Sequence, residues 1–223
     1  MEKNKKIIRG GTIITMDDAT GDIINGAILI EGNRISAISA DIQAFDHHTD
    51  AQVIDAQGAI VTPGMIDAHR HNWMALFRGV SAEESLPAFL INTFHAFGAM
   101  MTADNMYAAV LNGNISALNA GTTTVYEVND CVNSPDHAPA AIESLRASGI
   151  RSIYAYGMQA YDYKGSNRFR SHQQRLDVMK NIHQQYYGSG NKTLNQMGVL
   201  LSDFGTIPFA HTAKEIELAN DLG

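Results

Sequence analysis

His69 and His71 are the residues of this chain whose type and spacing most clearly predict chemistry. They follow the apolar run 59–68, within which the sequence predicts a buried strand over residues 61–68. Because side chains alternate between the two faces of a strand, both imidazoles are expected to point one way and Arg70 the other. Two imidazoles that converge on one point form part of a metal site. The sequence therefore predicts that His69 and His71 are metal ligands.

Two carboxylates and an indole near this pair are further candidates. Asp67 is expected on the same face as His69, where it either orients a ligand or caps a backbone turn. Glu127 lies near the carboxyl end of the strand predicted over residues 122–128, the end at which parallel barrels carry their active sites. Trp73 follows the histidines and either lines a pocket or packs in the core. We predict Trp73 and Glu127 as substrate contacts.

Two patterns of elements follow one another along the chain. Residues 1–60 alternate short strands with turns, and Gly32-Asn33 predicts a hairpin. From residue 61 strands alternate with helices, which is typical of parallel strands joined by right-handed crossovers. Four such units make half of an eight-unit barrel. The strands are predicted at residues 6–15, 26–31, 34–39, 53–55, 61–68, 122–128, 150–156 and 197–202, and the helices at 85–95, 102–119, 134–149, 171–187 and 212–222.

The helix predicted over residues 102–119 has Thr102 as its expected N-cap. Apolar side chains recur along it at helical spacing, so they are predicted to face the core. These side chains are Tyr107, Leu111, Ile115 and Leu118.

Composition excludes several classes of protein. A formal charge of −7 and a pI near 5.6 argue against a binder of nucleic acid or of anionic membranes. No stretch reaches the length of a membrane span, and the amino terminus lacks the apolar core of a signal peptide. Cys131 is the single cysteine, so no intrachain disulfide can form, which is consistent with a reducing compartment. We expect a cytoplasmic protein that acts on a small molecule.

The segment 58–71 resembles the signature of the amidohydrolase superfamily. In that signature a Pro-Gly pair, two hydrophobic residues, an Asp and two His residues spaced H-x-H lie on the first strand of a (β/α)8 barrel. Residues 6–35 resemble the small β-sandwich that precedes the barrel. Residues 120–125 and 148–151 resemble the second and third strand entries of the cytosine deaminase and triazine hydrolase branch. The resemblance implies an α/β fold, a partial TIM-type barrel over residues 61–223 preceded by a β-sandwich segment over residues 1–60.

The resemblance also implies the chemistry. Members of this family hydrolyse C–N or C–Cl bonds of nitrogen heterocycles with metal-activated water. The strand predicted over residues 197–202 carries no lysine like the one that bridges two metals in some members, so we expect one metal, zinc or iron. Gln159 resembles the amide with which cytosine deaminases grip a pyrimidine, and it is a third predicted substrate contact. The segment Tyr126–Asp130 departs from close members, which tend to carry an acidic-Trp-Ser-His type of sequence there.

The rest of the family's metal site has no counterpart among these four units. In the family, further ligands lie on the fifth, sixth and eighth strands, and the general acid or base is a Glu of the fifth-strand region. The catalytic residues are therefore unknown, and the isolated chain is expected to be inactive. One hypothesis is the amino-terminal portion of a metal-dependent amidohydrolase. The other is a catalytically inactive, truncated chain or pseudo-enzyme that acts as a partner-dependent interaction module. Self-association into a homo-oligomer is compatible with both.

Overall fold

The structure is a computed structural model that describes residues 5–158, 165–188, 194–203, 205 and 207–223. The chain divides into two compact units, Met1–Gly64 and Met65–Gly223. No helix in the described parts of the chain is both long and apolar enough to cross a lipid bilayer.

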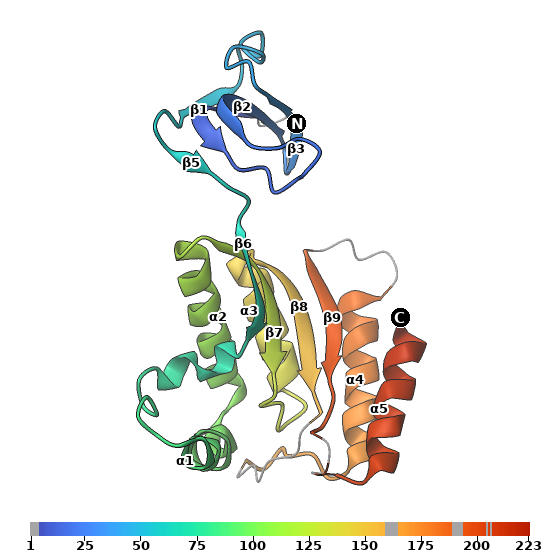
Figure 1. Ribbon diagram of the computed structural model, residues 1–223. Helices are drawn as coiled ribbons and strands as arrows, with labels where there is room; N and C mark the ends of the chain where they lie inside the picture. The colour runs from blue at the N-terminus through green and yellow to red at the C-terminus, as the bar shows by residue number, and fades with distance from the viewer. Residues whose placement is uncertain (1–4, 159–164, 189–193, 204, 206) are drawn as a thin grey trace. The chain divides into compact units, whose positions relative to one another are not determined.

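The first unit is built on a five-stranded sheet (Figure 1). Its central strand β1 (Lys5–Ile13) pairs antiparallel with β2 (Ile23–Glu31) and parallel with β4 (Gln52–Asp55) and β5 (Ile60–Val61). Strand β3 (Arg34–Ser39) pairs with β2 through the predicted hairpin, in which Gly32 has a φ of 65°. The small core under this sheet contains Ile7, Ala27, Leu29 and Phe45.

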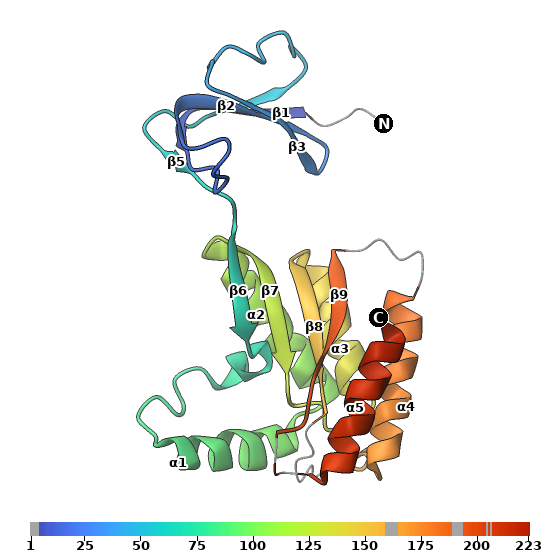
Figure 2. The ribbon, with the colours of Figure 1, turned by 45° about the vertical axis from the view of Figure 1, so that its right-hand side comes forward.

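The second unit contains a parallel sheet of four strands in the order β6-β7-β8-β9. The strands are β6 (Met65–Arg70), β7 (Thr122–Asn129), β8 (Arg151–Gly157) and β9 (Asn195–Leu200). Strands adjacent in sequence are adjacent in space, with their carboxyl ends at one edge (Figure 2). The predicted α/β fold with parallel strands is confirmed.

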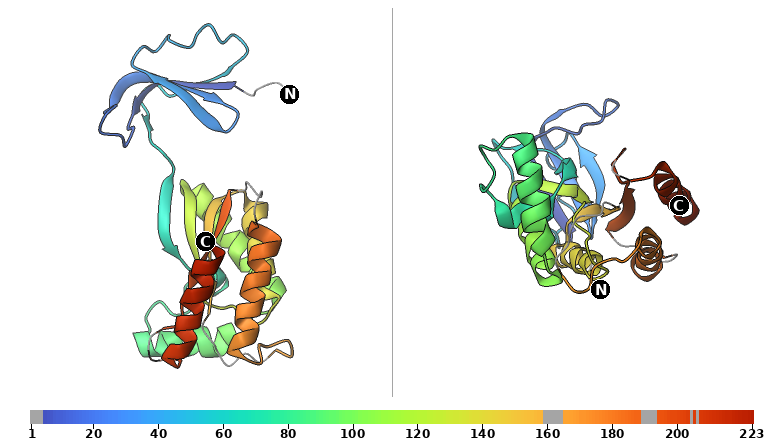
Figure 3. Two further views of the ribbon diagram at one scale, coloured as in Figure 1. Left: turned by 90° about the vertical axis from the view of Figure 1, so that its right-hand side faces the viewer. Right: turned by 90° about the horizontal axis from the view of Figure 1, so that it is seen from below.

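Helices cover one face of this sheet (Figure 3). They are α2 (Ala103–Asn119), α3 (His137–Ser148) and α4 (His172–Ile182), and α5 (Phe209–Leu222) packs against α4. Short helical segments η1 (Asn72–Phe77), α1 (Leu86–Leu90), η2 (Ile91–Phe97) and η3 (Gly98–Met100) connect β6 to α2, and η4 (His183–Tyr187) continues α4. The main core lies between the sheet and these helices and includes Val125, Cys131, Ile142, Leu145, Tyr154 and Tyr156.

Local signals explain where the helices begin and end. Thr102 caps α2 as predicted, because its Oγ1 accepts a hydrogen bond from the backbone N–H of Asn105 at 3.2 Å. Helix α3 ends at Gly149 in the left-handed conformation, with a φ of 73°. Helix α5 begins at Phe209, which is earlier than the predicted start at residue 212.

The prediction of a single buried strand over residues 61–68 is wrong. Strand β5 ends at Val61 in the sheet of the first unit, and β6 begins at Met65 in the second. Pro63 lies between them and has no N–H to donate to a strand partner. Strand β6 is also not buried: Ile66 is 72% exposed, because β6 is an outer strand and described helices cover only one face of its sheet.

The predicted core face of α2 is confirmed only at Leu118, which is half-buried and packs against the main core. Tyr107 and Ile115 are exposed, whereas the buried positions include Met106, Val110 and Gly113. The helix packs closely on α3 and η1, and small residues on the buried face permit this approach. The buried face of α2 is therefore less apolar than the face that Tyr107, Leu111, Ile115 and Leu118 were predicted to form.

Candidate metal centre

The histidine pair lies where β6 ends, at the carboxyl edge of the parallel sheet. The pairing of β6 with β7 shifts register here: Asp67 is opposite Val125, and Arg70 is opposite Glu127. Strand β6 thus has three steps where β7 has two. Such a bulge re-aims the side chains that follow it.

The rings of His69 and His71 converge. Their Nε2 atoms are 2.9 Å apart, and the ring planes meet at 68° with centroids 4.8 Å apart. Nitrogen atoms that lie about 2.0–2.1 Å from one Zn²⁺ ion are separated by about 2.9 Å at a right angle and about 3.4 Å at the tetrahedral angle. The two rings thus lie at hydrogen-bonding distance, and their separation also matches two nitrogen ligands at a right angle on one divalent metal; a tetrahedral zinc site needs them about 0.5 Å further apart.

Asp130, just after β7, holds the second histidine. Its Oδ1 lies 3.2 Å from His71 Nδ1 and accepts a hydrogen bond from Trp73 Nε1 at 2.5 Å. A carboxylate on Nδ1 selects the tautomer that leaves Nε2 available as a ligand. Burial by itself lowers the pKa of His71, but the hydrogen bond and the negative charge of Asp130 outweigh it, and the pKa is raised.

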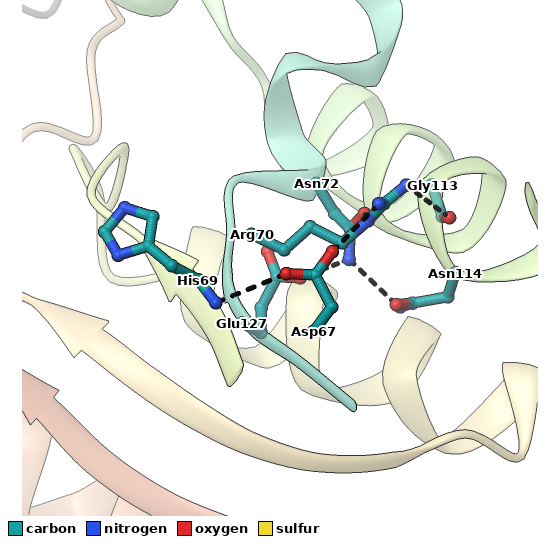
Figure 4. Close-up of polar contacts among 7 residues, drawn as sticks. All are labelled: Asp67, His69, Arg70, Asn72, Gly113, Asn114 and Glu127. Atoms are coloured by element: carbon teal, nitrogen blue, oxygen red, sulfur yellow. Dashed lines mark hydrogen bonds and ion pairs between the residues drawn. The ribbon is translucent and has the colours of Figure 1, made fainter. Parts of the chain in front are cut away.

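Asp67 lies on the other side of the strand from the imidazole of His69 (Figure 4). The expectation that Asp67 shares the face of His69 is wrong, because the bulge breaks the alternation of side chains. Its Oδ1 accepts from the backbone N–H of His69 at 3.3 Å, and its Oδ2 pairs with Arg70 Nη1 at 3.2 Å. The Asp67 carboxylate thus bonds to the backbone of His69 and to Arg70 within strand β6, and not to an imidazole or in a turn.

A polar network occupies the helix side of the same segment (Figure 4). Asn72 Nδ2 donates to Asn114 Oδ1 of α2 at 2.8 Å and to the Glu127 carboxylate of β7. Arg70 donates from Nε to Asn72 Oδ1 at 2.6 Å and from Nη2 to the carbonyl of Gly113 at 3.2 Å. The segment that carries the histidines is thus bonded to a helix and a neighbouring strand.

Glu127 is fully buried in this network. Burial raises its pKa to about 8, against the opposing effect of the hydrogen bonds with Asn72. A carboxylic acid with this pKa is mostly protonated at pH 7.

The three predicted substrate contacts have different outcomes. Trp73 and Glu127 are both fully buried, so neither side chain reaches the surface of the described chain. Gln159 lies outside the described residues. Contact of these residues with a substrate stays a prediction.

Sequence reasoning did not find the bond between Asp130 and His71, nor the network around Asn72. One indication of Asp130 was present in the sequence, its place at the carboxyl end of the strand predicted over residues 122–128, where barrels carry their active sites. Asn72 and Asn114 had none, because a buried amide in a helix is not distinguishable from an exposed one by spacing.

Within the described residues, no group of three or more His, Cys, Asp or Glu side chains is arranged to hold a metal ion. The described part of the chain therefore offers two converging imidazoles, not a complete coordination sphere.

Comparison with known proteins places this geometry in a family. The Amidohydrolase family matches residues 60–194, which is more than half of the chain. The chain belongs to the amidohydrolase family. The match begins just before the histidine pair and includes β6, β7 and β8.

Curated relatives of this amidohydrolase chain are deaminases. It is 34% identical over 158 residues to the 5'-deoxyadenosine deaminase of Methanothermobacter thermautotrophicus, an alignment that covers 71% of the chain and 34% of the relative. It is 31% identical over 156 residues to the 5-methylthioadenosine/S-adenosylhomocysteine deaminase of Carboxydothermus hydrogenoformans, covering 70% of the chain and 34% of the relative. The alignments thus span about a third of the length of these relatives.

Solved structures share the fold. Atrazine chlorohydrolase TrzN from Arthrobacter aurescens TC1, solved in complex with zinc, superimposes with a TM-score of 0.75 at 19% identity, covering 95% of this chain and 50% of that one. An adenosine deaminase from Xanthomonas campestris with bound zinc gives a TM-score of 0.71 at 18% identity, covering 98% of this chain and 47% of that one. The amidohydrolase chain thus has the fold of about half of these TIM-barrel proteins.

Proposed function

We propose that this chain is the metal-binding, amino-terminal portion of an amidohydrolase that hydrolyses a C–N bond of a nitrogen heterocycle. The observation that carries the proposal is the separation of 2.9 Å between His69 Nε2 and His71 Nε2, with Asp130 on the far nitrogen of His71. A divalent metal supplies the activation of water in such hydrolases. The chain's own residues hold two coordination positions and fix the tautomer of one ligand.

We infer that the metal is a single zinc or iron ion. Imidazole ligands suit both metals. Zinc is favoured because two structures of the same fold carry it. The strand predicted over residues 197–202, which corresponds to β9, carries no lysine like the one that bridges two metals in some members, which supports a single ion.

The proposed substrate is a small molecule with an exocyclic amino group on a purine-like ring. Relatives at 30% identity or above are named as deaminases of 5'-deoxyadenosine or of 5-methylthioadenosine and S-adenosylhomocysteine. Dechlorination of a triazine is the less favoured reaction, because the triazine hydrolases match at about 20% identity. We further propose a cytoplasmic location and no nucleic-acid or membrane partner, in line with the charge of −7.

A second candidate function is a catalytically inactive module that acts only through a partner. The observation in its favour is that the described residues bring together two ligands and no more. Catalytic zinc sites have three protein ligands, so the isolated chain is proposed to be inactive on either account. The two proposals differ in whether an assembly that contains this chain turns over substrate.

The test is release of ammonia from 5'-deoxyadenosine and, in a parallel assay of the rival reaction, release of chloride from atrazine. It is run on the zinc-loaded chain alone and on the chain purified with the proteins that accompany it in its cell. The enzymatic proposal predicts release by the assembly, loss of release in His69→Ala and His71→Ala, and none by the chain alone. An assembly that carries the intact chain and acts on neither substrate supports the inactive module.

A further inference from the structure

The residues that alternate with the two histidines are tied to the helix side of the sheet. Arg70, between His69 and His71, uses its Nε for Asn72 Oδ1, its Nη1 for Asp67 Oδ2 and its Nη2 for a carbonyl of α2. The guanidinium is thus fixed at three nitrogen atoms. It cannot rotate away without breaking charge-assisted hydrogen bonds.

Asn72 is the centre of these contacts. It is 2% exposed, it follows His71 directly in the chain, and its amide donates to Asn114 and to Glu127 while its Oδ1 accepts from Arg70. Three of the four hydrogen bonds that an asparagine amide can make are therefore formed inside the protein. A buried amide with partners on two other elements fixes its own backbone strongly.

Gly113 of helix α2 leaves the space that the Asn72 side chain occupies. A Cβ placed on Gly113 would lie 2.2 Å from Asn72 Oδ1, so no larger residue fits there while Asn72 keeps its place. Glycine inside a helix is less favourable than alanine, because it loses more backbone freedom on folding. The close approach of Asn72 to α2 thus needs a residue that weakens the helix.

We propose that Asn72, held by Asn114 and Glu127, is a positioning residue that fixes the convergence of His69 and His71. The inference rests on the proposed metal site and extends it to the opposite side of the strand. Ligands must be held within about 0.5 Å of their working geometry, and here the backbone next to His71 is anchored by Asn72. The role proposed for Glu127 is thus to hold Asn72.

Three variants and one control test the inference. Asn72→Ala removes the centre of the network. Glu127→Leu removes one anchor, and Glu127→Gln keeps an oxygen that can accept from Asn72 Nδ2. The control is Asn195→Ala, because Asn195 is also a buried asparagine, donating to the Ile150 carbonyl at 3.1 Å and to Ser152 Oγ at 2.8 Å, far from the histidines in the sheet order.

Two readouts are taken on the 223-residue chain. The first is the Kd for Zn²⁺, by competition with a chromophoric chelator. The second is the nuclear Overhauser effect between the ring protons of His69 and His71 in metal-free protein, which reports their convergence whether or not metal binds. Thermal midpoints are recorded for every variant, so that a loss of fold is seen separately.

We expect Asn72→Ala and Glu127→Leu to weaken Zn²⁺ binding about tenfold or more and to remove the ring-to-ring effect, as loss of supporting contacts does elsewhere. Glu127→Gln and Asn195→Ala are expected to keep both signals. The inference is overturned if Asn72→Ala keeps the ring-to-ring effect, or if Asn195→Ala loses it at an equal drop in thermal midpoint. A wild-type chain that shows the effect but binds no Zn²⁺ refutes the proposed metal site and leaves the positioning role standing.

Discussion

Asp130 illustrates how one carboxylate organises the site at the scale of single residues. Its Oδ1 accepts a hydrogen bond from Trp73 Nε1 and faces Nδ1 of His71. The indole of Trp73 packs in the core, and through this hydrogen bond it also holds the carboxylate that contacts His71. A carboxylate of this kind raises the basicity of the ligand and fixes its ring.

Replacing Asp130 tests that role. Asp130→Ala is expected to weaken Zn²⁺ binding about 10–100-fold, because the imidazole loses the partner that sets its tautomer. Asp130→Asn keeps a hydrogen-bond acceptor, so its affinity for Zn²⁺ should lie between those of the wild type and Asp130→Ala. Calorimetric titration with Zn²⁺ measures the effect, and Asp136→Ala serves as the control because it removes a nearby exposed carboxylate. Equal affinity in Asp130→Ala and Asp136→Ala would contradict the assignment.

Glu127 predicts a specific dependence of stability on pH. Its pKa is about 8 in the fold and near 4.5 when unfolded, so the folded chain holds a proton that the unfolded chain releases between these values. The contribution of Glu127 to the free energy of unfolding is fully present below pH 4.5 and is lost as the pH rises through 8. The loss is at most about 1.4 kcal/mol for each pH unit. Urea unfolding in metal-free buffer should therefore show that the free energy of unfolding of Glu127→Gln rises relative to that of the wild type between pH 5 and 8. Parallel profiles for the two proteins would count against a buried, protonated Glu127.

At the scale of elements, the fit between η1 and α2 decides whether the histidine segment keeps its place. Helix propensity predicts that Gly113→Ala stabilises α2, whereas the contact with Asn72 predicts a clash. We expect the clash to dominate and the free energy of unfolding to fall by about 1–3 kcal/mol. Asn112→Ala, at an exposed neighbouring position, is expected to be neutral or slightly stabilising. Chemical unfolding of both variants checks the sign, and a stabilised Gly113→Ala would refute the fit.

The elements themselves were largely predictable from the sequence. Apolar runs bounded by caps and glycines predicted β7, β8 and β9 to within two residues, and Thr102 and Gly149 marked two helix ends. Strand β6 was predicted only as part of a longer strand, which the structure breaks at Pro63. The side of Asp67 was not predictable, because it depends on a bulge whose register is set by pairing with β7. The buried face of α2 was missed because Gly113 and Asn114 are buried by their fit to Asn72, not by hydrophobicity.

At the scale of the whole molecule, the second unit is a sheet with helices on one face and two outer strands, β6 and β9. Met65 and Ile66 on β6 are 57% and 72% exposed. Exposed apolar strand edges favour association with other chains.

This exposure predicts self-association. Sedimentation velocity over rising protein concentration should show oligomers of the wild-type chain, and Ile66→Lys should reduce them by placing a charge on the outer strand. Ile24→Lys is the matched control, since Ile24 is 81% exposed but belongs to the first unit. A monomer at every concentration, or an equal effect of the two substitutions, would contradict this prediction.

Zn²⁺ affinity and stoichiometry of the purified chain would show whether His69 and His71 together bind a metal. His69→Ala and His71→Ala are compared with His47→Ala, in which a histidine of the first unit is removed. We expect one Zn²⁺ per chain, bound weakly because two ligands are present. Binding should be lost in His69→Ala and in His71→Ala and should be unchanged in His47→Ala. Binding that survives in either of the first two variants, or no binding by the wild-type chain, would contradict this expectation.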